Sequence, residues 1–172
     1  MAGKLVQVAT NTVSSAVATV TLTGIDSDDV YMLAMNNVQL DTDTKNIQYR
    51  FTVSGTAQST SNYDYAHKVL RANTTFSNES NTNQSLTYIN SVTGTGTGTG
   101  ETTQTILYLY NFNDSSDYSF VTKEQVTVDS NANLLGGQGG AVYTVAEAHD
   151  GIHFYTNAGN IASGTFTLYK VI

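Results

Sequence analysis

Two histidines, His149 and His153, stand four residues apart, the spacing at which a helix presents two ligands to a zinc ion. Gly151 lies between them, and the residues on either side follow the alternation of a strand. On that alternation both imidazoles lie on one strand face, with no third ligand in view. We interpret them as one histidine in a turn and one in a strand, and we predict no bound metal.

Aspartates gather in two short segments, 26–29 and 41–43, where carboxylates could supply oxygen ligands to Ca²⁺. An EF-hand loop would also require Gly at its sixth position and Glu at its twelfth, and neither segment has them. Aspartate favours turns as well, because its side chain accepts hydrogen bonds from the nearby main chain. We interpret both segments as turns.

The run 136–140, Gly-Gly-Gln-Gly-Gly, could be mistaken for a phosphate-binding loop. No Lys-Ser or Lys-Thr pair follows it, and no helix is predicted to point its N-terminus at an anion. We expect a tight turn here, or a close approach of the backbone to a neighbouring subunit. Ser54-Gly55 lacks the Gly-x-Ser-x-Gly frame of a hydrolase, and no Ser-His-Asp triad can be argued from the order of the residues.

Acidic residues also give no pair that could serve as the acid and base of a glycosidase, since most of the 14 fall in predicted turns. Aromatic residues could form a platform for sugar rings, but in β-sandwiches such residues are more often part of the core. The aromatic residues in question are Tyr63, Tyr65, Tyr108, Tyr110, Phe112, Tyr118 and Phe120. We predict no catalytic residue, no cofactor and no enzymatic activity.

The polar surface of this 172-residue chain must come from its 27 Thr, 16 Asn and 15 Ser, because only 12% of its residues are charged. Thr and Tyr favour strands, whereas Asn and Ser favour turns. The chain has no Cys and therefore no disulfide, and its length suits one domain. The composition predicts an all-β domain with a neutral polar exterior, and it excludes long helices.

Charge and hydropathy exclude two classes of partner. The net charge is −7 and no run of basic residues occurs, so we expect no binding to nucleic acid. No stretch approaches the roughly 18 apolar residues of a membrane helix, and the first residues lack the apolar centre of a signal peptide. We expect a soluble protein made in the cytoplasm, with no membrane partner.

Alternation of apolar and polar residues places the strands that would carry any binding site. The expected strands are 16–23, 30–38, 47–53, 63–70, 105–112, 118–122, 125–128, 141–145, 151–156 and 165–171. Strands 30–38 and 105–112 are apolar on both faces, which indicates that both faces are covered. Eight to ten strands without a helix predict a sandwich or barrel, and we favour an antiparallel two-sheet β-sandwich of jelly-roll type.

Between these strands lie segments with no core pattern. We expect 1–15 to be a flexible N-terminal arm, 72–85 an exposed loop and 93–100 a flexible loop tip, with 16–172 forming a single sandwich domain. These segments and the glycine run supply the candidate binding residues. They are Leu5, Val6 and Val8 in the arm, Phe76, Asn78 and Asn81 in the first loop, and Gln138 in the glycine run.

Several motifs resemble a group of virion proteins of tailed bacteriophages, especially marine and cyanobacterial phages. The closing segment 160–169, Asn-Ile-Ala-Ser-Gly-Thr-Phe-Thr-Leu-Tyr, carries most of the resemblance. It extends to 16–25, 54–58, 63–66, 134–140 and 153–154, so most of the chain after residue 15 is covered. Lys170 departs from the pattern, in which a glycine commonly follows the Leu-Tyr pair.

The resemblance implies a β-sandwich structural protein of the virion with no catalytic residues. We expect a capsid decoration (cement) protein that forms a homotrimer, binds the major capsid protein on the outer surface of the capsid and stabilises the shell. The alternative is a tail fibre or spike domain that binds a host glycan through the loops 72–85 and 93–100.

Overall fold

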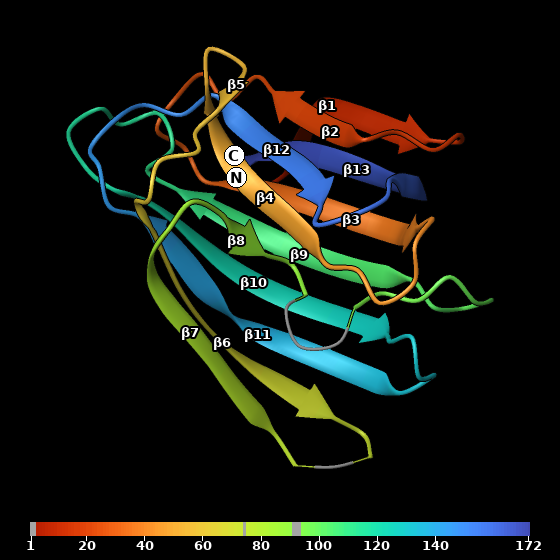
Figure 1. The fold of residues 1–172 in the computed structure, drawn as a ribbon. Coiled ribbons are helices and arrows are strands. Elements are labelled where there is room, and N and C mark those ends of the chain that lie inside the picture. Colours follow the sequence, from red (N-terminus) through yellow and green to blue (C-terminus); the bar gives the residue numbers. More distant parts are fainter. Residues whose placement is uncertain (1–2, 74, 91–93) are drawn as a thin grey trace.

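The computed structural model describes residues 3–73, 75–90 and 94–172, which form two β-sheets and, within those ranges, no helix (Figure 1). The larger sheet contains, in spatial order, β1 (Leu5–Val13), β13 (Ile161–Val171), β3 (Tyr31–Leu40), β9 (Thr103–Tyr110), β10 (Ser119–Val128), β11 (Leu134–Tyr143), β6 (Tyr63–Arg71) and β7 (Ser77–Gln84). The smaller sheet contains β2 (Thr19–Thr23), β12 (Gly151–Thr156), β4 (Ile47–Val53) and β5 (Thr56–Ala57), with β8 (Thr87–Tyr88) also paired to β4.

The pairing order is that of a jelly roll. Eight of the strands pair from the outside inwards, β1 with β13, β2 with β12, β3 with β9 and β4 with β8, all antiparallel. The strands β10, β11, β6 and β7 continue the larger sheet beyond β9, away from β2 and β12 (Figure 1). The predicted antiparallel two-sheet sandwich is confirmed, and the additional strands raise the predicted eight to ten to thirteen within the described ranges.

The core between the two sheets is built from the inward side chains of both. Phe51 of β4 lies 4.5 Å from Phe112 between ring centroids, and Phe154 of β12 lies 5.2 Å from Phe166 of β13. All four side chains are fully buried. Burying aromatic rings removes the largest apolar areas of the chain from water, so this layer holds the two sheets together.

The N-terminal residues are part of the sandwich, whereas the sequence predicts a flexible arm over 1–15. Residues 5–13 form β1, which pairs with β13, and Val13 is buried. Lys4 and Ile172 exchange backbone hydrogen bonds of 2.6 and 3.0 Å. An edge strand needs only one hydrogen-bonded neighbour, so it can form from a sequence with few apolar residues. Residues 1 and 2 lie outside the described ranges.

Two further segments predicted as loops are strands. Most of 72–85 forms β7, a polar edge strand paired with β6, although Thr74 lies outside the described residues. The glycine run 136–140 lies within β11, between β10 and β6. A Cβ atom at Gly139 would lie 2.3 Å from the carbonyl oxygen of Ala66, so this position leaves no room for a side chain.

The Thr-Gly segment 93–100 is only in part an exposed tip. Thr95 is fully buried, where its Oγ1 accepts a 2.8 Å hydrogen bond from Asn90 and lies 3.1 Å from Thr103 Oγ1. The residues from 97 to 100 are exposed, and Glu101 accepts a 2.7 Å hydrogen bond from the backbone of Gly98. Thr93 lies outside the described residues. Among the residues that are described, no helix is long and apolar enough to cross a membrane.

Candidate functional site

The larger sheet turns one face to the smaller sheet and presents the other, here called the outer face, to solvent. Side chains alternate between the two faces, so in β9 Leu107 is fully buried while the neighbouring Tyr108 is 38% exposed. The outer face therefore consists of every second residue of β3, β9, β10, β11 and β6. Its large apolar side chains, each 38–52% exposed, are Leu70, Ile106, Tyr108, Phe120, Val126 and Leu134.

A groove of about 730 Å³ runs over the part of the outer face formed by β10, β11, β6 and β7. Gly140 and Ala66 lie side by side in the register of β11 and β6 and leave a shallow floor. Phe120 and Val142, which are paired across β10 and β11, form a wall beside that floor. A hollow next to a ridge of apolar side chains on one face is a shape that fits another protein surface.

Two opposite charges also lie on the outer face. In the register of the sheet, Glu124 of β10, Gln138 of β11 and Lys68 of β6 form one row across three strands. The Nε2 of Gln138 donates a 3.4 Å hydrogen bond to the Glu124 carboxylate. The Lys68 ammonium lies 5.3 Å from the ring centre of Phe76. The row leaves Glu124 and Lys68 one strand to either side of β11.

The predicted binding residues do not come together in one site. Leu5, Val6 and Val8 lie on β1, Asn78 and Asn81 lie on β7 with Phe76 just before it, and Gln138 lies on β11. Strands β1 and β7 are the two opposite edges of the larger sheet. Of this set, Gln138 is on the outer face beside the groove, and Asn78 shares its row through Lys68.

The exposed aromatics of the outer face are the part of the site that sequence reasoning missed. The core assignment holds for Tyr63 and Phe112, which are fully buried, but Tyr118 and Phe120 are each 42% exposed. The apolar residues on both faces of 105–112 indicated that both faces are covered. In the structure nothing among the described residues covers the outer one, so the same signal marks an exposed apolar surface.

A buried cluster in the core has the residue types of a hydrolase triad. Ser119 Oγ lies 2.8 Å from His149 Nδ1, and His149 Nε2 lies 3.6 Å from Glu147 Oε1. Serine and acid thus approach the opposite nitrogens from those of the serine-protease arrangement. Ser119 and His149 are both fully buried, and burial lowers the pKa of His149 to about 4. A substrate cannot reach this serine, so the cluster satisfies buried polar groups.

A second buried polar group, Lys123, fastens the smaller sheet to the extension of the larger one. Its Nζ donates hydrogen bonds of 3.1 and 2.8 Å to the carbonyl oxygens of Tyr88 and Ile89. The side chain is 3% exposed, and burial lowers its pKa to about 7. Burial, with the Lys123 charge, also lowers the pKa of His67 to about 3. At neutral pH His67 is therefore uncharged, and its 4.0 Å approach to Glu79 is not an ion pair.

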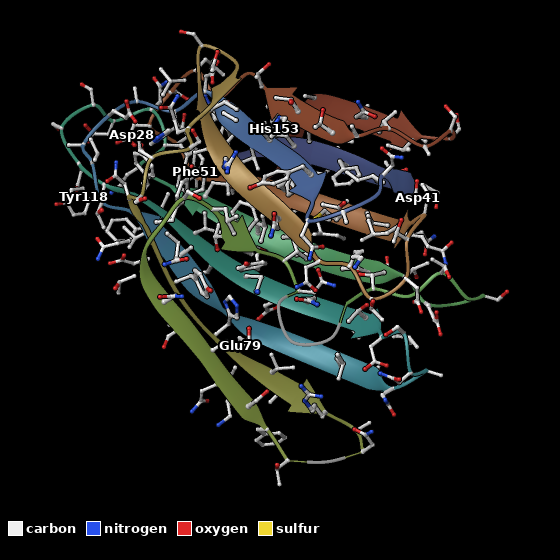
Figure 2. All side chains as sticks on the ribbon, in the orientation of Figure 1. Asp28, Asp41, Phe51, Glu79, Tyr118 and His153 are labelled. Atoms are coloured by element: carbon white, nitrogen blue, oxygen red, sulfur yellow. The ribbon has the colours of Figure 1, made fainter. Side chains whose placement is uncertain are left out.

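The two aspartate segments lie at opposite ends of the sandwich, as Figure 2 shows for Asp28 and Asp41. Asp29 lies 2.7 Å from Lys170 Nζ, and this partner lowers the pKa of the Asp29 carboxyl. Asp41 accepts two 2.8 Å hydrogen bonds from Asn160. Both segments are turns, as predicted.

The structure places the two histidines of the i, i+4 pair apart. His149 lies in the buried cluster, whereas His153 lies on β12, with its Nδ1 2.8 Å from Thr21 Oγ1. The expectation that both lie on one strand face is wrong, because residue 149 precedes β12 and does not follow its alternation. Within the described part of the chain, no three His, Asp or Glu side chains are grouped so that they could hold a metal ion.

Comparison with protein-family models finds no match to this chain, and comparison with curated proteins finds none either. The geometry of the site is therefore the basis for a functional assignment, together with the sequence resemblance described above.

Proposed function

We propose that this protein is a non-enzymatic structural subunit of a tailed-phage virion, a decoration or cement protein on the capsid. Its copies associate with one another and with the major capsid protein, and the contact area of many copies stabilises the shell. Binding at several points at once multiplies weak contacts into stable attachment. The resemblance to tailed-phage virion proteins favours this station.

The outer face is the observation that carries the proposal. Soluble monomers rarely leave a contiguous apolar surface of more than a few hundred Å² uncovered, and large exposed patches commonly mark protein interfaces. Here Ile106, Tyr108 and Phe120 are about two-fifths exposed on neighbouring strands of one sheet. Such a surface binds by area and shape, which is what a structural subunit requires.

Imaging of the assembled particle tests the proposal. A map of the virion is expected to contain density that fits this sandwich at many equivalent positions on the capsid surface. Particles that lack the protein should lose that density and release their DNA at a lower temperature. Density confined to the tail, or an unchanged capsid in its absence, would overturn the assignment.

An exposed aromatic beside a polar strand favours one second candidate, a tail fibre or spike domain that binds a host glycan. Phe76 is 61% exposed and precedes the asparagine-rich β7. Aromatic rings stack on sugars, and amides supply hydrogen bonds to hydroxyl groups. Binding on a glycan array that disappears with Phe76→Ala, but persists with the Leu5→Ala control at the opposite edge of the sheet, would support this candidate over the first.

A further inference from the structure

We propose that two copies of this chain pack through their outer faces about a two-fold axis that runs along β11. The inference rests on the proposed function, for which it names the surface that joins one copy to another. A half-turn about this axis exchanges the strands on either side of β11, so that β6 of one copy lies over β10 of the other. It also preserves the position of each residue along the strand direction.

Small residues on the axis permit the two sheets to approach. The outward residues at the centre of β11 are Gly136, Gln138 and Gly140, since their neighbours in the register, Leu70, Lys68 and Ala66, point outward from β6. Glycine carries no side chain, so the backbones of two copies can come closer here than elsewhere on the face. The axis along β11 is thus the line of closest contact.

Charges match across the same axis. Glu124 and Lys68 lie in one row, one strand to either side of Gln138. The half-turn places Lys68 of each copy opposite Glu124 of the other, which gives two symmetric pairs of opposite charge. Opposite charges at matched positions fix the register of an interface and exclude arrangements that bring like charges together.

Apolar side chains match in the neighbouring rows. Val126, Gly136 and Leu70 form one row, so Leu70 of one copy lies opposite Val126 of the other. Phe120 pairs with Val142, which pairs with Asp64 of β6, so the half-turn carries Phe120 over the partner copy's groove. The ridge of each copy therefore enters the hollow of the other. This reciprocal contact is the mark of an isologous dimer.

The area of the face is sufficient for a stable dimer. Five neighbouring strands spaced about 4.8 Å apart, each with about eight residues rising 3.3 Å, present a face of roughly 24 by 26 Å. Two copies would bury about 1,200 Å² in total, which is at the lower bound for specific protein interfaces. Sheets that pack face to face in this way align their strands to within about 30°.

Charge reversal tests the pairing. We expect light scattering of the purified protein to give twice the 18.4 kDa chain mass. Lys68→Glu and Glu124→Lys should each raise the dissociation constant of the dimer at least about tenfold, because each places two like-charged pairs in the interface. The double variant restores opposite charges and should return to within about threefold of wild type. Lys4→Glu and Asp28→Lys, on exposed positions away from the outer face, are the matched controls.

The outcomes separate this inference from the proposed function. Circular dichroism verifies that each variant folds, and Ala66→Arg, which blocks the groove floor, should also give a monomer. A wild-type monomer, or a dimer that survives both single reversals, would overturn the two-fold contact. Three times the chain mass with unchanged single variants would instead place the contact elsewhere and agree with the trimer of the resemblance. A protein that decorates capsids as a monomer would leave the proposed function standing.

Discussion

Lys123 is a lysine whose hydrogen bonds are made but whose charge is taken out of water. Its Nζ reaches the carbonyl oxygens of Tyr88 and Ile89, yet burial lowers its pKa to about 7 from an unfolded value of 10.5. Between those values the unfolded chain holds a proton that the folded protein lacks. Raising the pH through this window therefore favours the folded state, and lowering it removes that stability.

We expect the free energy of unfolding to rise by a few kcal/mol between pH 7 and pH 10. In Lys123→Met, which keeps the length of the side chain without its charge, the rise should be absent. Above pH 10 the trend reverses, because burial raises the pKa of Tyr49 and Tyr63, whose protons the folded state retains. Urea unfolding at a series of pH values measures this, and an equal slope in both proteins would contradict it.

Ser119 tests the absence of enzymatic chemistry at the same scale. Although its Oγ lies 2.8 Å from His149, the residue has no exposed surface. A fluorophosphonate probe, which labels accessible activated serines, should therefore leave the native protein unlabelled. Mass spectrometry of the intact protein is the measurement. Labelling that disappears in Ser119→Ala would contradict the non-enzymatic assignment.

At the scale of the element, β11 holds glycines where two neighbouring strands press on it. A Cβ atom at Gly139 would lie 2.5 Å from the Cα of His67 and closer still to the backbone of Ala66. At Gly137 the nearest atom would be the flexible end of Gln125 at 3.0 Å. We expect Gly139→Ala to lower the free energy of unfolding by about 1–3 kcal/mol and Gly137→Ala to change it by less than about 1 kcal/mol. Equal losses in urea unfolding would be inconsistent with this packing.

Strand β1 gives a second prediction at this scale. Its backbone bonds cover the edge of β13, and Val13 is part of the core. Deleting residues 1–13 should therefore lower the midpoint of thermal unfolding by 10 °C or more, on the order of 2 kcal/mol for a chain of this size. Deleting residues 1–3 is the control. An unchanged midpoint after the longer deletion would restore the flexible arm that the sequence predicts.

The strands that could be predicted from sequence are those with alternating or continuous apolar residues. Residues 47–53 were predicted as a strand and form β4, and 165–171 lie in β13. Strands β1, β7 and β11 were missed because backbone hydrogen bonds from neighbours form them, and no local pattern records that. The exposure of Phe120 was missed for the same reason, since the sequence shows an apolar face but not whether another layer covers it.

The whole molecule folds around contacts between distant parts of the chain. Strand β1 pairs with β13, so residues more than 150 positions apart must meet before the larger sheet is complete. High sequence separation slows folding to milliseconds or seconds. The chain has no proline, which removes the isomerisation steps that take tens of seconds. Stopped-flow refolding at low protein concentration is expected to finish within seconds, and a phase of tens of seconds would contradict this.

Because Lys4 and Ile172 are hydrogen-bonded to each other, both ends of the described chain emerge side by side (Figure 1). They do so at the β1 edge, on the opposite side of the larger sheet from β6 and β7. A cargo fused to either end would project from the same corner, clear of the groove. The two ends are thus equivalent sites for display, and joining them would create a new start elsewhere in the ring at little cost.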